Sequence, residues 1–253
     1  ASWNKWLAGQ TWSNFQDVAA LPDAVDFIGP TDGTIFARQP QIRYTSGPWS
    51  VSLENPETLV GTPGRVSSDD NTLPDLTVRY THKHASGHFS AAALLHELSY
   101  EDVPSGIDDA AVGYGLSLSG RQVLNPNNDL RYMLTVGRGI NRYIGLATAN
   151  DAVVDDDNQL EDVGVVAGFA AWRHVFSPKL RGNLYYSAAH YDNETAFSGL
   201  GATKRVHSLA GNLIWTVLPK LDVGAELRLA NREIESGADG DLRRLQMHVK
   251  YSF

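Results

Sequence analysis

The chain has 253 residues, no Cys, 42% hydrophobic residues and a formal net charge of −8. The absence of Cys excludes disulfides and zinc–thiolate sites, and the acidic charge lacks the basic footprint of a nucleic-acid-binding protein. The longest nearly uncharged apolar stretch covers residues 163–172, far short of the roughly 20 residues that a spanning helix needs. Helical membrane spans are therefore excluded, whereas spans made of strands with alternating polarity are not.

The first predicted element is a strand within residues 1–15, and a long connection over 14–32 follows it, with one helical turn expected over 18–25. The apolar side chains of this connection are Val18, Leu21, Val25, Phe27 and Ile28. Because so apolar a segment would not remain in water, we expect it to fold into the mouth of a barrel or to pack on a neighbouring protomer. Its acidic side chains would then form a constriction loop facing the wall: Asp17, Asp23 and Asp26.

Beyond residue 32, hydrophobic side chains occupy every second position in one run after another. Runs of this kind begin near residues 76, 112, 130, 209, 221 and 245. In the last run, Leu245, Met247 and Val249 alternate with Gln246 and His248. Alternate side chains of a strand point to opposite faces of a sheet, so each run predicts a strand with one apolar and one polar face.

The connections between these runs alternate in length. Compact turns are expected at 46–48, 85–87, 125–128, 177–179 and 218–220, and long connections at 55–75, 101–109, 147–162, 192–204 and 233–241. Barrels of the bacterial outer membrane show this alternation, with short periplasmic turns and long external loops. We therefore predict an all-β fold, a transmembrane antiparallel up-and-down β-barrel of about twelve strands that forms a single domain over residues 1–253.

A soluble barrel of the lipocalin type would show the same alternation. Its polar face would be a charged, well-solvated exterior. Here the polar face is rich in Gly, Ser, Thr and Asn with scattered Arg, which suits a lumen better.

Aromatic residues add a second indication of a membrane barrel. The chain ends in Tyr251-Ser252-Phe253, and a terminal Phe with an aromatic residue two positions earlier resembles the assembly signal of outer-membrane barrels. Further aromatic residues lie beside the expected short turns: Trp3, Trp6, Trp49, Trp172 and Phe176. Tyr and Trp favour the membrane–water boundary because one end of the ring is apolar and the other can form a hydrogen bond. These positions predict an aromatic girdle at the periplasmic side.

Four segments carry a resemblance to a known family. They are GQTWSNF at 9–15, AALPDAVDF at 19–27, RQPQIRY at 38–44 and LENPE at 53–57. Together they resemble the DcaP family of porins, with specificity over roughly the first quarter of the chain. The resemblance implies homotrimeric outer-membrane channels that prefer dicarboxylates and similar anions. It also implies a barrel of about sixteen strands, so this chain either lacks N-terminal family strands or closes with fewer.

Placing the apolar face against lipid assigns the other face to the lumen. Its cations, which we predict to line the pore and bind solute, are Arg43, Arg79, Lys83, Arg121, Arg131, Arg173, Arg181, Arg228, Arg244 and Lys250. The acidic residues in the same register are Glu54, Asp222 and Glu226. Rings of Arg and Lys select anions, and a guanidinium pairs with a carboxylate in a two-pronged geometry. Alternatively, each Arg pairs with a loop carboxylate and only braces the wall.

Catalytic and cofactor motifs are absent from the sequence, so neither an enzyme nor a cofactor is expected. His82, His84 and His88 are read as exposed turn residues and not as metal ligands. The predicted function is a passive diffusion porin for small anionic solutes such as dicarboxylates, in contact with outer-membrane lipid. The alternatives are the translocator barrel of an autotransporter, which would need a helix threading the pore, and a non-conducting structural barrel.

Overall fold

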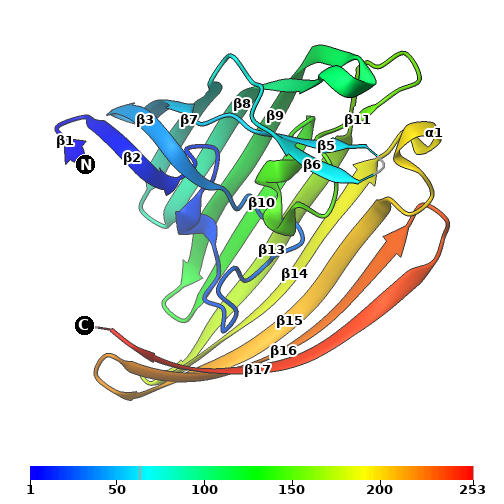
Figure 1. Cartoon of the computed structure of the whole chain (residues 1–253). Coiled ribbons are helices and arrows are strands. Elements are labelled where there is room, and N and C mark those ends of the chain that lie inside the picture. The colour runs from blue at the N-terminus through cyan, green and yellow to red at the C-terminus, as the bar shows by residue number, and fades with distance from the viewer. Residues whose placement is uncertain (63, 253) are drawn as a thin grey trace.

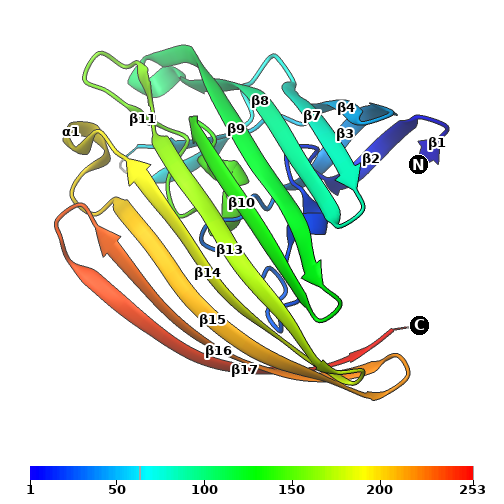
Figure 2. The ribbon, with the colours of Figure 1, turned by 180° about the vertical axis from the view of Figure 1, so that it is seen from behind.

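The computed structural model describes residues 1–62 and 64–252, and a single antiparallel sheet of 13 strands dominates it (Figures 1 and 2). In spatial order these strands are β1 (Ser2–Trp3), β2 (Trp6–Trp12), β3 (Arg38–Ser46), β4 (Trp49–Glu54), β7 (Asp75–His84), β8 (Gly87–Asp102), β9 (Ile107–Asn125), β10 (Asn128–Arg138), β13 (Gly164–Ser177), β14 (Leu180–Asp192), β15 (Thr203–Leu218), β16 (Leu221–Ile234) and β17 (Asp239–Tyr251). Each strand pairs with the next in an up-and-down meander, as predicted from the alternation.

The count exceeds the predicted twelve because the first predicted strand is a small hairpin. Strand β1 contains only two residues, and Ser2 and Trp3 pair with Leu7 and Trp6 of β2. The sheet curves around an interior, with β1–β2 along one edge and β17 along the other (Figure 1). Within the described part of the chain these two edges are not paired with each other, so the predicted closure is not seen there.

Two long connections add a second, smaller sheet over the interior. It consists of β5 (Thr58–Gly61), β6 (Arg65–Ser68), β11 (Ala152–Val154) and β12 (Leu160–Asp162), in the order β12-β11-β5-β6. The pairing of β11 with β5 is parallel and joins segments about ninety residues apart. Sequence patterning did not predict these strands, because runs of three or four residues are too short to show a period.

The helical elements are single turns: η1 (Val18–Ala20), η2 (Val103–Ser105), η3 (Asn141–Tyr143), η4 (Gly145–Ala147) and α1 (Thr195–Ser198). Only η1 was expected from the sequence. Across residues 1–62 and 64–252, no helix has the length and apolar character needed to cross a membrane.

The predicted compact turns are present, but two predicted long connections are short. Strand β8 continues to Asp102 and β9 begins at Ile107, whereas β16 continues to Ile234 and β17 begins at Asp239. The ladders extend into both segments, with Glu101 opposite Asp108 in the first. Asp-rich composition indicated loops here, and cross-strand pairing keeps the chain extended instead.

The two faces of the main sheet have the predicted orientation. On the outer face Leu227 and Val249 are 53% and 72% exposed, whereas the inward-facing Arg228 is only 3% exposed. Aromatic rings meet in pairs on the outer face near the short turns, with 4.8 Å between the ring centroids of Trp49 and Tyr80. An exposed apolar exterior with a polar interior is the arrangement of a membrane barrel. The predicted role of Phe253 lies outside the described residues.

The expectation of a continuously polar lumen is wrong for the part of the wall that the loops cover. Strand β13 is apolar on both faces in this region, and its inward Val165, Ala167 and Phe169 are buried. They belong to a dry cluster that also contains Phe15 and Ile144 from two loops. Because loops shield this inner face from water, apolar side chains are stable there.

Candidate functional site

The connection between β2 and β3, residues 13–37, folds inward along the wall, and we call it the inner loop. At its start Asp17 caps η1 by accepting a hydrogen bond from the amide of Ala19 at 3.1 Å. The other oxygen of its carboxylate lies 2.8 Å from Nε2 of His88 on β8 and accepts a hydrogen bond from Ser119 on β9 at 2.9 Å. The predicted constriction residue Asp17 therefore anchors the loop to the wall.

A buried carboxylate on the wall gathers three of the predicted lumen cations. Asp129, at the start of β10, lies 2.9 Å from Arg121, 2.9 Å from Arg131 and 3.3 Å from Arg173. Sequence reasoning missed Asp129, although it precedes Arg131 by two positions and so shares its face of the strand. Three guanidinium groups thus share one carboxylate.

A second group joins the inner loop to the neighbouring wall. Asp23 of the loop lies 3.1 Å from Nε of Arg181 and 3.6 Å from Nε of Arg173. Arg181 also contacts Asp222 on β16 at 2.8 Å. We call Arg121, Arg131, Arg173 and Arg181 the arginine cluster. Its members are partly exposed, with side-chain exposures between 13% and 37%.

The tip of the inner loop docks on β15 to β17 through Asp26, Asp32 and Arg228. Asp26 forms an ion pair with Arg244, and Asp32 accepts a hydrogen bond from the hydroxyl of Ser208. Arg228 donates hydrogen bonds to the carbonyl of Gly29, to the hydroxyl of Thr31 and, at 3.1 Å, to the hydroxyl of Tyr185. Since Arg228 lies behind the loop and is 3% exposed, it holds the loop and does not face solute.

Asp26 and Asp32 of the inner loop have pKa values shifted in opposite directions. Burial raises the pKa of Asp32 above its ordinary value, and this effect exceeds the opposing effects of Ser208 and Arg228. Burial also raises the pKa of Asp26, but its hydrogen bond from the Ile28 amide and its contact with Arg244 reverse the shift, so the net pKa is lowered. Ionised Asp26 is therefore stabilised by its site, whereas ionised Asp32 is not.

The remaining predicted lumen cations have no acidic partner in an ion pair within residues 1–62 and 64–252. Arg43 donates to the carbonyl of Trp12 at 2.5 Å, and Arg79 donates to the carbonyl of Gln16 at 2.6 Å. Lys83 and Lys250 are exposed. Their positive charges are therefore not neutralised by a contacting carboxylate.

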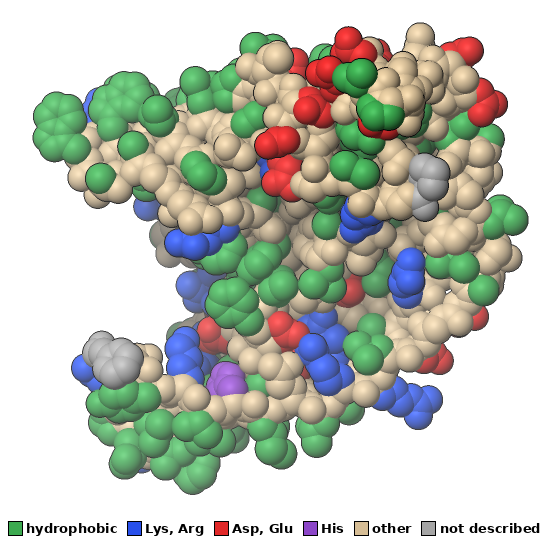
Figure 3. All heavy atoms as spheres, in the orientation of Figure 1, with side chains coloured by type: hydrophobic (Ala, Val, Ile, Leu, Met, Phe, Trp, Pro, Cys, Tyr) green, Lys and Arg blue, Asp and Glu red, His purple; other side chains and the backbone are tan. Residues whose placement is uncertain are grey.

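A cavity of about 810 Å³ opens at the end of the sheet that carries the short turns, and we call it the vestibule. Its charged and titratable inward-facing side chains are Asp17, Arg79, Lys83, His88 and Arg121. On the face shown in Figure 3, Lys and Arg side chains gather around the hollow between the two edges of the sheet. The vestibule therefore has more cations than carboxylates, and it is open to water.

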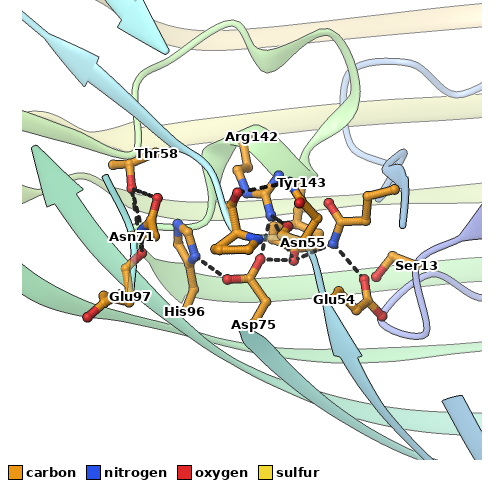
Figure 4. A network of polar contacts seen from close by, with 12 residues as sticks. Ser13, Glu54, Asn55, Thr58, Asn71, Asp75, His96, Glu97, Arg142 and Tyr143 are labelled. Atoms are coloured by element: carbon orange, nitrogen blue, oxygen red, sulfur yellow. Dashed lines mark hydrogen bonds and ion pairs between the residues drawn. The ribbon is translucent and has the colours of Figure 1, made fainter. Parts of the chain in front are cut away.

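At the opposite end, a polar network fixes the segment 139–151, which we call the second loop (Figure 4). Asp75 of β7 lies 2.6 Å from Nδ1 of His96 on β8, and its other oxygen accepts hydrogen bonds from Arg142 and Tyr143 of η3. Gln39 donates to the Tyr143 hydroxyl at 2.9 Å. The side chains of Asp75 and His96 are 0% exposed. An Asp–His pair can serve in catalysis, but this pair is closed to solute and holds the loop.

Burial dominates the electrostatics of the second loop. It raises the pKa of Tyr143 well above the ordinary value and also raises the pKa of Asp151. For Arg142 burial lowers the pKa, but Tyr143, Asp75 and Asp151 reverse the effect and the net pKa is raised. Arg142 thus remains charged, because the groups around it stabilise its positive charge.

The described residues, which omit only 63 and 253, contain no cluster of three His, Asp or Glu side chains placed to hold a metal ion. The rings of His82 and His84 stack with their centroids 6.1 Å apart at the short turn, where both line the edge of the vestibule, whereas His88 pairs with Asp17.

Comparison with known proteins places these features in a family. The family model for the DcaP outer membrane protein matches residues 1–253. The crystal structure of the outer membrane channel DcaP of Acinetobacter baumannii is 26% identical, with a TM-score of 0.89 over 100% of this chain and 72% of that chain. A search of curated proteins found no match.

Two more distant solved structures share the fold. The anion-selective porin from Comamonas acidovorans is 9% identical with a TM-score of 0.59, covering 98% of this chain and 74% of that one. The outer-membrane-expressed OmpT of Vibrio cholerae is 12% identical with a TM-score of 0.59, covering 97% and 76%. With the match over its whole length, this chain belongs to the DcaP family of outer-membrane proteins and is a porin of the bacterial outer membrane.

Proposed function

We propose that this porin is a passive diffusion channel that favours small anionic solutes such as dicarboxylates. The observation that carries the proposal is the charge of the vestibule, where Arg79, Lys83 and Arg121 line the same open cavity and Asp17 is its only lining carboxylate among the described residues. Low-dielectric walls focus the field of such unbalanced charges, so anions concentrate in the vestibule and cations are depleted.

The arginine cluster supports a preference for carboxylates. Arg121, Arg131 and Arg173 share Asp129, so their donors outnumber the oxygen atoms that contact them. A guanidinium binds a carboxylate through two parallel hydrogen bonds. A dicarboxylate could therefore move from one partly exposed guanidinium to the next.

The wall is proposed to be closed in the membrane and to form a homotrimer. An unpaired strand edge in hydrocarbon leaves backbone N–H and C=O groups without partners, at a cost of several kcal/mol for each group. The exposed apolar outer face would contact outer-membrane lipid. The trimer rests on the resemblance to DcaP porins alone.

One observation favours a second candidate, a non-conducting structural barrel. The inner loop and the second loop pack with the wall into a buried cluster that includes Phe15, Tyr143 and Tyr185. Such packing would close the lumen if no water path remained beside it. The autotransporter alternative loses its support, because the matching family spans the whole chain.

Planar-bilayer recording of the purified protein tests the proposal. Under a tenfold KCl gradient we expect a reversal potential of the sign given by chloride permeation, and added potassium succinate should interrupt the chloride current. A reversal potential of the opposite sign would refute anion preference. Stable insertion without conductance would favour the structural barrel.

A further inference from the structure

A polar pocket of about 280 Å³ lies at the loop end of the interior, away from the vestibule. It is bounded by the β5–β6 hairpin, by residues 148–153, by the segment around α1 and by the end of β16. The side chains that matter for its chemistry are Arg65, Asn150, Asn193, Thr203 and Arg232. We call it the mouth pocket. Neither of its arginines was among the predicted lumen residues.

Both arginines are held in place by neutral acceptors. Arg65 donates from Nε to the side-chain oxygen of Asn150 and from Nη1 to the carbonyl of Ala147, each at 2.7 Å. Arg232 donates from Nε and Nη2 to the hydroxyl of Thr203 at 3.0 and 2.8 Å. Within the described chain, Nη2 of Arg65 and Nη1 of Arg232 have no hydrogen-bond partner. Each guanidinium is thus oriented, with one terminal nitrogen still available.

The charges of these two arginines are also uncompensated. Neither forms an ion pair with a carboxylate of residues 1–62 and 64–252. At the same end of the sheet, by contrast, Arg138 pairs with Asp162 at 2.6 Å and Arg205 pairs with Glu233. Glu235, which is not among the lining residues, accepts a hydrogen bond from Asn193 at 2.8 Å.

We propose that the mouth pocket is a carboxylate-binding subsite, the first contact for anionic solutes that approach from the side of the long loops. This inference rests on the proposed anion channel and extends it to a second site. Two oriented donors on two cations match the two oxygens of a carboxylate, and pre-ordered donors lose little entropy on binding. The volume is below the roughly 300–1,000 Å³ of pockets for drug-sized ligands, so it suits a short mono- or dicarboxylate.

Single-channel recording with succinate on one side at a time tests the subsite in the complete protein purified from outer membranes. In the double variant Arg65→Gln, Arg232→Gln we expect the rate of current interruptions by succinate from the loop side to fall about tenfold. The rate from the short-turn side should change less. The matched control is Arg205→Gln, which removes one charge at the same end but on the outer face, where Glu233 already neutralises it.

A second variant separates binding from folding. Because Arg65 also ties the β5–β6 hairpin to residues 147 and 150, Arg65→Lys with Arg232→Lys keeps both charges and removes the fork of donors. This variant should keep most of the association rate and shorten each interruption. Heat-dependent gel migration verifies that every variant is folded.

The outcomes distinguish this inference from the proposed function. If wild-type protein prefers anions and the double variant responds to loop-side succinate as Arg205→Gln does, the subsite is rejected and the anion channel stands. If wild-type protein does not conduct or prefers cations, the proposed function fails. Saturation-transfer NMR of succinate on micellar protein then decides the subsite alone: a signal weakened in the double variant but not in Arg205→Gln supports it, and equal signals overturn it.

Discussion

The interior has two halves that differ in whether their charged side chains are buried with partners or line an open cavity without them. In the loop half, the second loop is locked to the wall through Asp75, and the side chains of Asp75 and His96 are fully buried. In the short-turn half, Arg79 and Lys83 line a cavity of about 810 Å³ and have no carboxylate in an ion pair within the described residues. One wall with one alternating pattern supports both arrangements.

The difference shows that the loops, and not the strands, decide which part of the interior is aqueous. A buried charge is stable only when it is paired and hydrogen-bonded, so the buried ions Asp75 and Arg142 of the loop half contact each other, whereas Arg65 and Arg232 line the open mouth pocket. Where water has access, unpaired cations cost little and their field remains available to a solute. We therefore assign stability to the buried network around Asp75, and the field that selects anions along the lumen to the short-turn half.

The largest expected effect is the loss of the anchor at Asp75. In Asp75→Ala, Arg142 and His96 are left buried without their carboxylate, which should lower the free energy of unfolding by about 3–5 kcal/mol. Urea unfolding of the protein in detergent, followed by Trp fluorescence, measures the change. The control Asp156→Ala removes an exposed acid of a neighbouring loop. Equal midpoints for the two variants would contradict the division into halves.

A smaller effect is expected where the inner loop touches the wall backbone. A Cβ atom on Gly33 would lie 2.1 Å from the carbonyl oxygen of Gly168 and 2.4 Å from that of Ala188, so Gly33→Ala must displace the loop tip at a cost of about 1–3 kcal/mol. We expect higher single-channel conductance, because the displaced loop packs less tightly against the wall. Gly240→Ala, which meets nothing within 4 Å, should leave conductance unchanged. Equal conductance in both variants would show that this contact does not set the lumen.

The smallest effect is an opposite pH response of two acids in the inner loop. The pKa of Asp32 is raised from 3.8, so its contribution to docking is present below pH 3.8 and is lost as the pH rises through the folded-state value. The pKa of Asp26 is lowered from 3.8, so its contribution is present above pH 3.8 and is lost as the pH falls through the folded-state value.

Hydrogen exchange of residues 20–36 between pH 3 and pH 7 measures this response, after correction for the intrinsic exchange rate. Asp32→Asn should remove the loss of protection on the alkaline side, and Asp26→Asn should remove the loss on the acidic side. Identical pH profiles for the two variants would show that the two sites are not electrostatically distinct.

Much of the wall could be predicted from the sequence, because a strand with one face in lipid and one in water records both environments in its alternation. That pattern predicted the meander and the side on which Leu227, Arg228 and Val249 lie. The apolar composition of residues 14–32 separately predicted that this segment either folds into the barrel mouth or packs on a neighbouring protomer, with Asp17, Asp23 and Asp26 facing the wall. The pattern is lost on β13, where Val165 and Phe169 face a loop, and so both faces are apolar.

The second loop and the mouth pocket could not be predicted in this way. Arg142 and Tyr143 reach Asp75 from more than sixty positions away, and Arg65 meets Asn150 from 85 positions away. Such contacts cross the interior between loops, where no period constrains which side chains meet. Asp129 of the wall differs from these residues, because it shares a strand face with Arg131 and could have been counted among the lumen acids.

The cation excess of the vestibule is the central claim, and the reversal potential of a vestibule variant tests it most directly. Across a tenfold KCl gradient, Arg79→Gln with Lys83→Gln should lose most of the wild-type preference for chloride, whereas Lys179→Gln, on a turn at the same end but outside the vestibule, should keep it. Unchanged chloride preference in the double variant would contradict the account.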